Sequence, residues 1–488
     1  MASLEEIRLE RLKKLELLKE RGVNPYPSES RQDHTLAEAA ERFDELSADG
    51  DVSLVGRVMA MRGQGALVFV DLYDGTGRLQ ALIKKDNLPE ESFALFQDAV
   101  DIGDFVEVAG NLFVTKREEK TIEAKSWRML SKSLRPLPDK WHGLQDEEER
   151  LRRRYLDMLV NPETRDIAVK RSRFWSSMRE FLLARGFFEV ETPVLENTAG
   201  GAEARPFVTH HNALDLDVYL RISPELWLKR LMVAGFTKVF EIGRIFRNEG
   251  ISPEHLQDYT QMEFYWAYAD YRKGMKMVEE LYKHVAQETF GTLQFAIKGH
   301  EIDLAKEWAM YDYRETILEK TGFDIERASL ETVEAKLREL DIRYDREGFN
   351  LTRAIDTLWK YCRKQIAGPG FLVNVPVYME PLAKRKEDDR ELVERFQVLL
   401  AGSEMGKGFS ELNDPLDQAG RFAEQAALRE AGDEEAQMYD QDFVEALEYG
   451  MPPTCGFGVS ERLFSFLMDK PVRECQLFPL MRPKTKEE

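Results

Sequence analysis

The chain has 488 residues, 43% of them hydrophobic, which is enough for two or more domains with substantial cores. Its formal net charge of −20 argues against a general affinity for nucleic acids, but it leaves room for a local basic patch. The three cysteines are widely spaced without a metal-binding pattern, and no apolar run is long enough to span a membrane. We therefore expect a cytoplasmic protein with reduced thiols and no membrane partner.

Residues 1–50 are predicted to form an N-terminal helix and a lead-in. Ser3 and Glu6 make a capping-box pattern before a stripe of leucines, and Gly22 marks the end of a helix over 3–21. The opposite face of this helix is basic, and it is either a solvated surface or a contact for nucleic acid. Its residues are Arg8, Arg11, Lys14 and Arg21.

Residues 51–131 alternate as the strands of a small barrel do. Three strand-like segments come first, with the turn Asp74-Gly75-Thr76-Gly77 between the second and the third. A helix near 90–99 precedes two more strand-like segments. Five strands with a helix in this position indicate an OB fold, which often binds single-stranded nucleic acid.

Residues 132–157 contain Pro136, Pro138 and a basic run, and they are predicted to link two domains. The second domain is expected to cover 158–488. A segment rich in Glu, Lys and Leu predicts a helical insertion near 300–370.

The segment 240–265 carries polar groups at alternating positions of two strand-like stretches. Because alternate side chains of a strand share one face, Glu263 and Tyr265 project to the same side. A hairpin with arginine and glutamate on its polar face suits a ligand with both phosphate and amine groups. Taken alone, the same pattern also fits a solvated hairpin.

This segment resembles motif 2 of the class II aminoacyl-tRNA synthetases, and the whole chain resembles the bacterial-type lysyl-tRNA synthetases. The resemblance implies an α+β protein, with an OB-fold barrel followed by an antiparallel sheet flanked by helices. It implies ligation of L-lysine to tRNA(Lys) with ATP and Mg²⁺. Residues 171–196 resemble motif 1, which implies a homodimer. The other matching stretches are 134–157, 200–231, 408–415 and 477–484.

The resemblance also assigns the nucleotide site. Arg247 and Arg462 are expected to act in catalysis, since a guanidinium group can hold phosphate or carboxylate oxygens in pairs. Glu404 and Glu411 are the expected metal ligands, because magnesium prefers oxygen donors. The ATP-binding residues are expected to be Arg247, Glu249, His255, Tyr259, Glu404, Glu411 and Arg462.

The lysine site is expected beside it. An ammonium group needs anionic or neutral acceptors, whereas an aspartate pocket would need cations, so Glu263 favours lysine. The expected lysine-binding residues are Gly201, Glu225, Arg247, Glu263, Tyr265 and Asn413.

Four residues of the barrel match anticodon-reading positions of the resembled family. An aromatic ring on an OB strand can stack on a base, and polar side chains can read base edges. A strand phenylalanine is more often part of the barrel core, and that alternative stays open for Phe69. The four residues are Arg62, Phe69, Gln80 and Glu119.

The chain departs from the family at the nucleotide site. Residues 256–259 read Leu-Gln-Asp-Tyr where Asn-Pro-Glu-Phe is common, and Glu254 stands at a frequently basic position. The stretch 456–463, which resembles motif 3, is one residue short. Three alternatives remain: a relative that lysylates a protein, an aspartyl- or asparaginyl-type enzyme, and a nucleic-acid-binding protein without catalysis.

Overall fold

The computed structural model describes residues 3–138, 144–250, 252, 254–344 and 349–484. The chain divides into two compact units, 1–147 and 148–488, each with its own core. The division falls inside the segment 132–157 that the sequence predicts as a linker. Among the described residues, no helix is long and apolar enough to cross a membrane.

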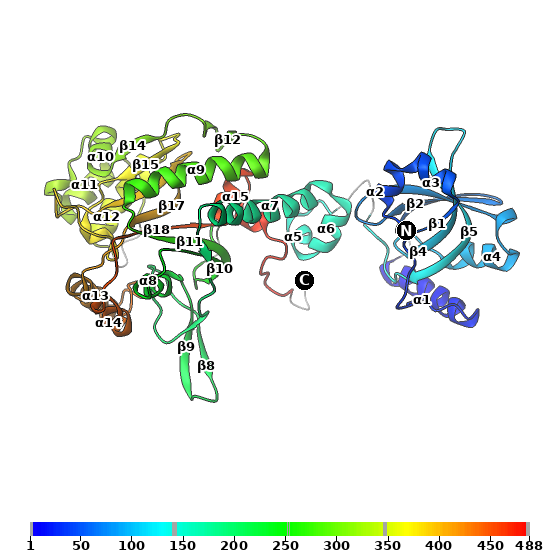
Figure 1. Ribbon diagram of the computed structural model, residues 1–488, viewed down its shortest axis with the longest axis horizontal. Coiled ribbons are helices and arrows are strands. Elements are labelled where there is room, and N and C mark those ends of the chain that lie inside the picture. The colour runs from blue at the N-terminus through cyan, green and yellow to red at the C-terminus, as the bar shows by residue number, and fades with distance from the viewer. Residues whose placement is uncertain (1–2, 139–143, 251, 253, 345–348, 485–488) are drawn as a thin grey trace. The chain divides into compact units, whose positions relative to one another are not determined.

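The first unit is a closed five-stranded barrel in the order β1-β2-β3-β5-β4, drawn in blue and cyan in Figure 1. Every second residue of β2 and β4 is buried, as expected of strands that line a barrel core. The barrel confirms the predicted OB fold, and its helix α4 (Glu90–Ala99) follows β3 as expected. The strands are β1 (Asp51–Gln64), β2 (Leu67–Tyr73), β3 (Arg78–Lys84), β4 (Phe105–Val114) and β5 (Lys120–Ser131).

The helices of this unit are α1 (Leu4–Glu20), α2 (Leu36–Glu41), α3 (Phe43–Asp49) and α4 (Glu90–Ala99). At the start of α1, Ser3 and Glu6 form the predicted capping box.

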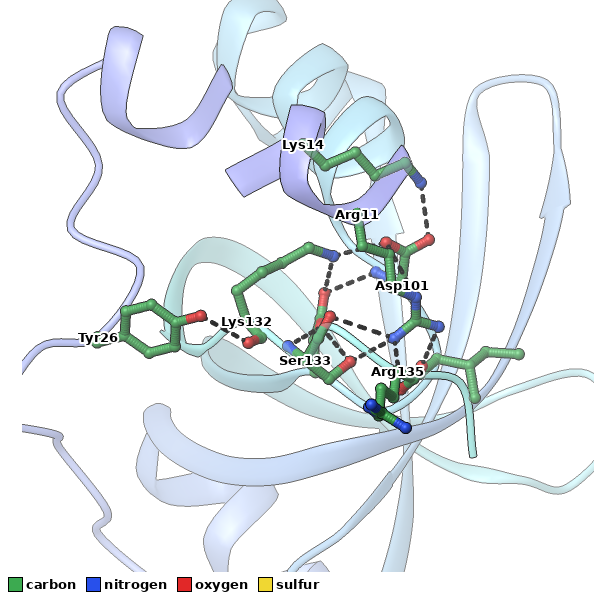
Figure 2. A network of polar contacts seen from close by, with 9 residues as sticks. Arg11, Lys14, Tyr26, Asp101, Lys132, Ser133 and Arg135 are labelled. Atoms are coloured by element: carbon green, nitrogen blue, oxygen red, sulfur yellow. Dashed lines mark hydrogen bonds and ion pairs between the residues drawn. The ribbon is translucent and has the colours of Figure 1, made fainter. Parts of the chain in front are cut away.

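Polar contacts attach α1 to the barrel (Figure 2). Arg11 is buried and donates hydrogen bonds to the carbonyl oxygen of Ile102, 2.9 Å away, and to Ser133. Lys14 forms an ion pair with Asp101 at 2.7 Å. These two members of the basic helix face are therefore engaged within the unit, so Arg11 is not a surface contact for nucleic acid.

The second unit is built on an eight-stranded sheet in the order β14-β15-β16-β17-β18-β11-β10-β6. Its central strands are antiparallel, while the outermost pairs β14–β15 and β10–β6 are parallel. The strands are β6 (Phe188–Glu189), β10 (Lys238–Phe246), β11 (Asp258–Ala267), β14 (Ala309–Asp312), β15 (Gly370–Val373), β16 (Arg395–Leu400), β17 (Ser403–Ser410) and β18 (Thr454–Ser460).

The two faces of this sheet pack against different helices. On one face, Met262 and Phe264 of β11 pack in a core with α7 (Pro162–Ala184) and α9 (Tyr271–Phe290). On the other face, Tyr265 packs in a core with α8 (Glu225–Val233) and with helices from residues 313–448. This second face also carries the polar residues of β11, so the alternation of the sequence decides which face holds a site. Figure 1 shows α9 running along the sheet.

Helices follow one another over residues 313–363, within the predicted insertion. They are α10 (Tyr313–Thr321), α11 (Leu330–Glu339) and α12 (Leu351–Arg363). The remaining helices are α5 (Glu147–Arg152), α6 (Arg154–Val160), α13 (Pro415–Glu430), α14 (Gln441–Glu448) and α15 (Arg462–Leu467). The smaller sheets are made by β7 (Leu195–Glu196), β8 (Val208–His211), β9 (Leu216–Leu220), β12 (Gln294–Ile297) and β13 (His300–Asp303).

Candidate active site

Two glycines of β18 make room for the acidic side chains of the site. Gly458 lies opposite Glu263 and Gly456 lies opposite Tyr265 in the β11–β18 register. A Cβ atom at Gly456 would stand 2.0 Å from an oxygen of Glu411, so no other residue fits there without displacing that carboxylate. The structure shows that Gly456 accommodates the protein's own carboxylate.

Glu263 is buried and is held by neutral donors. Its carboxylate accepts hydrogen bonds from Ser223 Oγ at 2.7 Å, Gln261 Nε2 at 2.5 Å and the Tyr265 hydroxyl at 3.0 Å. Burial and the neighbouring charge of Glu225 raise the pKa of Glu263 to about 7. The carboxylate is thus oriented by three hydrogen bonds but lacks a cationic partner among these contacts.

Glu225, Lys229 and Glu411 form a buried charged chain next to Glu263. Glu225 and Lys229 lie one turn apart on α8, so their side chains meet on one face, with Lys229 Nζ 2.5 Å from Glu225 Oε1. Lys229 also pairs with Glu411, which follows β17. Burial raises the pKa of Glu411 well above its usual range, although the charge of Lys229 opposes the shift.

Glu225, Glu263 and Glu411 line a cavity of about 370 Å³, which also reaches Arg247 and Tyr259. Arg247 follows β10, and its guanidinium carbon lies 5.7 Å from the centre of the Tyr259 ring, in a cation–π contact. Arg462 opens α15 and lines the same cavity. Of the residues predicted from the sequence, the cavity brings together Gly201, Glu225, Arg247, Tyr259, Glu263, Tyr265, Glu404, Glu411 and Arg462.

Three predicted residues do not line this cavity. His255 lies in a neighbouring depression with Arg244 and Arg473. Asn413 Nδ2 donates to the carbonyl oxygen of Met451, and its Oδ1 accepts a hydrogen bond from Lys384. Glu249 follows Arg247 on the same loop, and its charge acts on Tyr259.

The four residues predicted to read the anticodon lie toward the outside of the barrel. Phe69 pairs with Arg62 across β1 and β2, while its chain neighbours Val68 and Val70 are buried. Phe69 is therefore not part of the barrel core. Gln80 lies opposite Asp71, two residues after Phe69, so its side chain shares that face. Glu119 is exposed in the turn before β5.

Comparison with known proteins agrees with this geometry. Residues 146–482 match the family model of the class II tRNA synthetases (D, K and N), and residues 52–130 match that of the OB-fold nucleic acid binding domain. The chain belongs to the class II tRNA synthetases. It is 46% identical to the lysine–tRNA ligase of Thermotoga maritima, over 99% of this chain and 98% of the relative. It is also 46% identical to the lysine–tRNA ligase of Moorella thermoacetica, over 97% of each chain.

The carboxylates of this class II chain fit a cation that keeps most of its water. Glu404 and Glu411 line the same cavity, and Glu404 Oε1 accepts a hydrogen bond from Trp359 Nε1 at 2.7 Å. Oε2 of Glu411 pairs with Lys229, while its buried Oε1 has no hydrogen-bond partner, which leaves lone pairs on that oxygen for a ligand. In the described part of the chain, no cluster of three or more His, Cys, Asp or Glu side chains is arranged to hold a metal. Two carboxylates with water and phosphate oxygens suit Mg²⁺.

Several residues of the site were missed by the sequence analysis. Ser223 and Lys229 lie two residues before and four residues after Glu225, and the helical spacing of Glu225 and Lys229 could have indicated a pair. Glu380 is different, because it joins Arg395 at 3.0 Å and Lys407 at 3.2 Å from distant parts of the sequence. No local pattern predicts that cluster.

Proposed function

We propose that this chain ligates L-lysine to tRNA(Lys) in an ATP-dependent reaction that passes through a lysyl-adenylate. The observation that carries the proposal is an excess of buried negative charge. The charges of neighbouring carboxylates help to raise the pKa of Glu263 and of Glu411, and among the ion pairs of the described residues Lys229 is the one cationic partner that Glu225, Glu263 and Glu411 have between them. Burying unpaired carboxylates is costly, so the cavity favours a ligand that brings positive charge.

Lysine carries two ammonium groups, and the carboxylates could receive both. We assign the side-chain ammonium to Glu263, with Tyr265 beside it, because Glu263 is held by neutral donors alone. We assign the α-amino group to Glu225 and the backbone near Gly201, whose Cβ position is closed by the side chains of Glu225 and Ser223. Asn413 remains a predicted contact of the lysine side chain.

The arginines belong to the other end of the ligand. We assign Arg247 to the carboxylate of lysine and the α-phosphate of ATP. Its guanidinium group can hold one oxygen of each, where the carboxylate attacks the α-phosphate. Tyr259 would then give up its contact with Arg247 or share it with the purine ring. Glu249 would accept the adenine amino group, and Arg462 and His255 would contact the triphosphate.

Mg²⁺ bound with ATP would neutralise phosphate charge during the transfer. We assign it to Glu404 and Glu411. Glu411 also pairs with Lys229, which in turn pairs with Glu225, so the assigned metal site and the assigned lysine site are connected through Lys229.

The alternatives are less well supported. An aspartyl-type enzyme would need free cations at the amino-acid side chain, but Arg395 and Lys407 are both paired with Glu380. A protein-lysylating relative would not need the barrel surface of Arg62, Phe69, Gln80 and Glu119, which we assign to the anticodon. We further propose that the chain acts as a homodimer in the cytoplasm.

Amino-acid-dependent ATP–pyrophosphate exchange tests this proposal. The full chain should exchange pyrophosphate with lysine and with none of the other nineteen standard amino acids to a comparable extent. Lysylation of tRNA(Lys) should follow under the same conditions. Exchange that depends on aspartate or asparagine, or activity with no amino acid, would refute the assignment.

A further inference from the structure

Two cations, Lys298 and Arg462, lie at the border of the nucleotide cavity. The two oxygens of Glu254 contact two cations, with Lys298 Nζ at 2.6 Å from one oxygen and Arg462 paired with the other. Burial by itself would raise the pKa of Glu254, but the hydrogen bond from Lys298 and the charge of Arg462 lower it. One anionic group thus bridges the arginine of motif 3 and a lysine more than a hundred residues away in sequence.

Several contacts fix the position of Lys298. It lies in the turn between β12 and β13, with the left-handed backbone (φ 49°) that a tight hairpin requires. Its backbone N–H donates to Asp469 at 3.3 Å, and its ammonium lies 5.4 Å from the ring centre of Phe466. Its Nζ also approaches Ser403 Oγ at 3.4 Å. The turn is therefore held against α15 and the start of β17.

The two cations border a cavity of about 200 Å³. Arg462 lines this cavity and also the larger cavity with Arg247 and Glu263, so the two spaces meet at its side chain. A triphosphate whose first phosphate lies at Arg247 would extend toward Arg462. The group that it meets there is the carboxylate of Glu254.

We propose that Lys298 binds the outer phosphates of ATP and pyrophosphate together with Arg462, and that these phosphates displace the Glu254 carboxylate. The proposal rests on the proposed function only in taking ATP as the nucleotide. A phosphate group carries more negative charge than a carboxylate and offers more acceptor oxygens, so it can replace Glu254 between the two cations. Glu254 therefore competes with the phosphates for the two cations and weakens nucleotide binding.

Direct binding measurements separate these roles. Isothermal titration calorimetry with a nonhydrolysable ATP analogue, and separately with pyrophosphate, requires no turnover and no choice of amino acid. Lys298→Ala should weaken both ligands about 5- to 20-fold, a modest loss because the ammonium is partly exposed. Lys298→Arg should restore most of the affinity. Glu254→Gln should strengthen binding about 3- to 10-fold, because a competing charge is lost.

Lys306→Ala is the matched control, since Lys306 is an exposed lysine of the same region, and it should bind as the original chain does. Unchanged binding by Lys298→Ala would overturn the phosphate contact. Weaker binding by Glu254→Gln would overturn the displacement, because it would mean that Glu254 positions Arg462. If the proposed function failed, exchange with lysine would be absent while the binding differences persisted.

Discussion

Replacing Glu263 by glutamine tests the origin of amino-acid selectivity. The substitution keeps the shape of the side chain and removes its charge. Ser223 and Gln261 can still donate to an amide oxygen at the position of Oε1, and the amide NH₂ group can donate to the Tyr265 hydroxyl. Glu263 is 4% exposed, so water cannot replace the lost charge around a bound ammonium. Removing one partner of a buried charge pair costs about 2–5 kcal/mol. Lysine should therefore bind roughly 30-fold to 4,000-fold less tightly.

The same substitution should not destabilise the protein without ligand. Burial raises the pKa of Glu263 to about 7, which means that its charged form is disfavoured in the folded chain. Glutamine removes that cost, so the melting temperature of Glu263→Gln should be equal or higher at pH 8. Loss of affinity together with retained stability would separate a binding role from a structural one.

The assay is lysine-dependent ATP–pyrophosphate exchange, with the KM for lysine and for ATP measured separately. Glu241→Gln is a matched control, because Glu241 is a buried glutamate directly opposite Glu263 and pairs with Arg221 at 2.6 Å. It should lower stability by a few kcal/mol and leave selectivity for lysine intact. A KM for lysine within about threefold of the original in Glu263→Gln would refute the reasoning, since that corresponds to well under 1 kcal/mol.

Three further predictions follow from the same geometry. Arg247→Ala should lower kcat/KM for exchange about a hundredfold or more without a change in melting temperature, and retained exchange would contradict its role. Phe69→Ala should raise the KM for tRNA about tenfold in lysylation and spare exchange, whereas an equal loss in both assays would count against base stacking. Because Glu263 must be ionised to bind an ammonium, the KM for lysine should rise as the pH falls below about 7. Over the same range the stability of the ligand-free chain should increase as the pH falls from 7 toward 4.5, and Glu263→Gln should reduce both effects.

The sequence predicted the parts of this protein that depend on local pattern. The barrel strands alternate between buried and exposed residues, and the capping box at Ser3 is a short-range signal. The alternation on β11 also predicted correctly that Glu263 and Tyr265 share a face. In each case the residues that determine the structure are only a few positions apart, within one strand or one helical turn.

The basic face of α1 shows where local pattern stops. All four of its residues are basic, and the sequence does not distinguish them. In the structure, Arg11 is buried against Ser133 and the carbonyl oxygen of Ile102, while Lys14 pairs with Asp101. Which charges remain free depends on how the helix packs on the barrel. That packing joins residues about a hundred positions apart, and no periodicity encodes it.

The altered motif 2 loop makes the same point at the active site. Read in sequence, Glu254 replaces a frequently basic residue and so weakens the expected triphosphate site. In the structure, Glu254 pairs with Lys298, a lysine of the β12–β13 turn. A residue from outside the loop thus offsets the charge of Glu254, so the net charge of the site cannot be judged from motif 2 alone. A class II chain with a glutamate at this position should be assessed together with the turn that faces it.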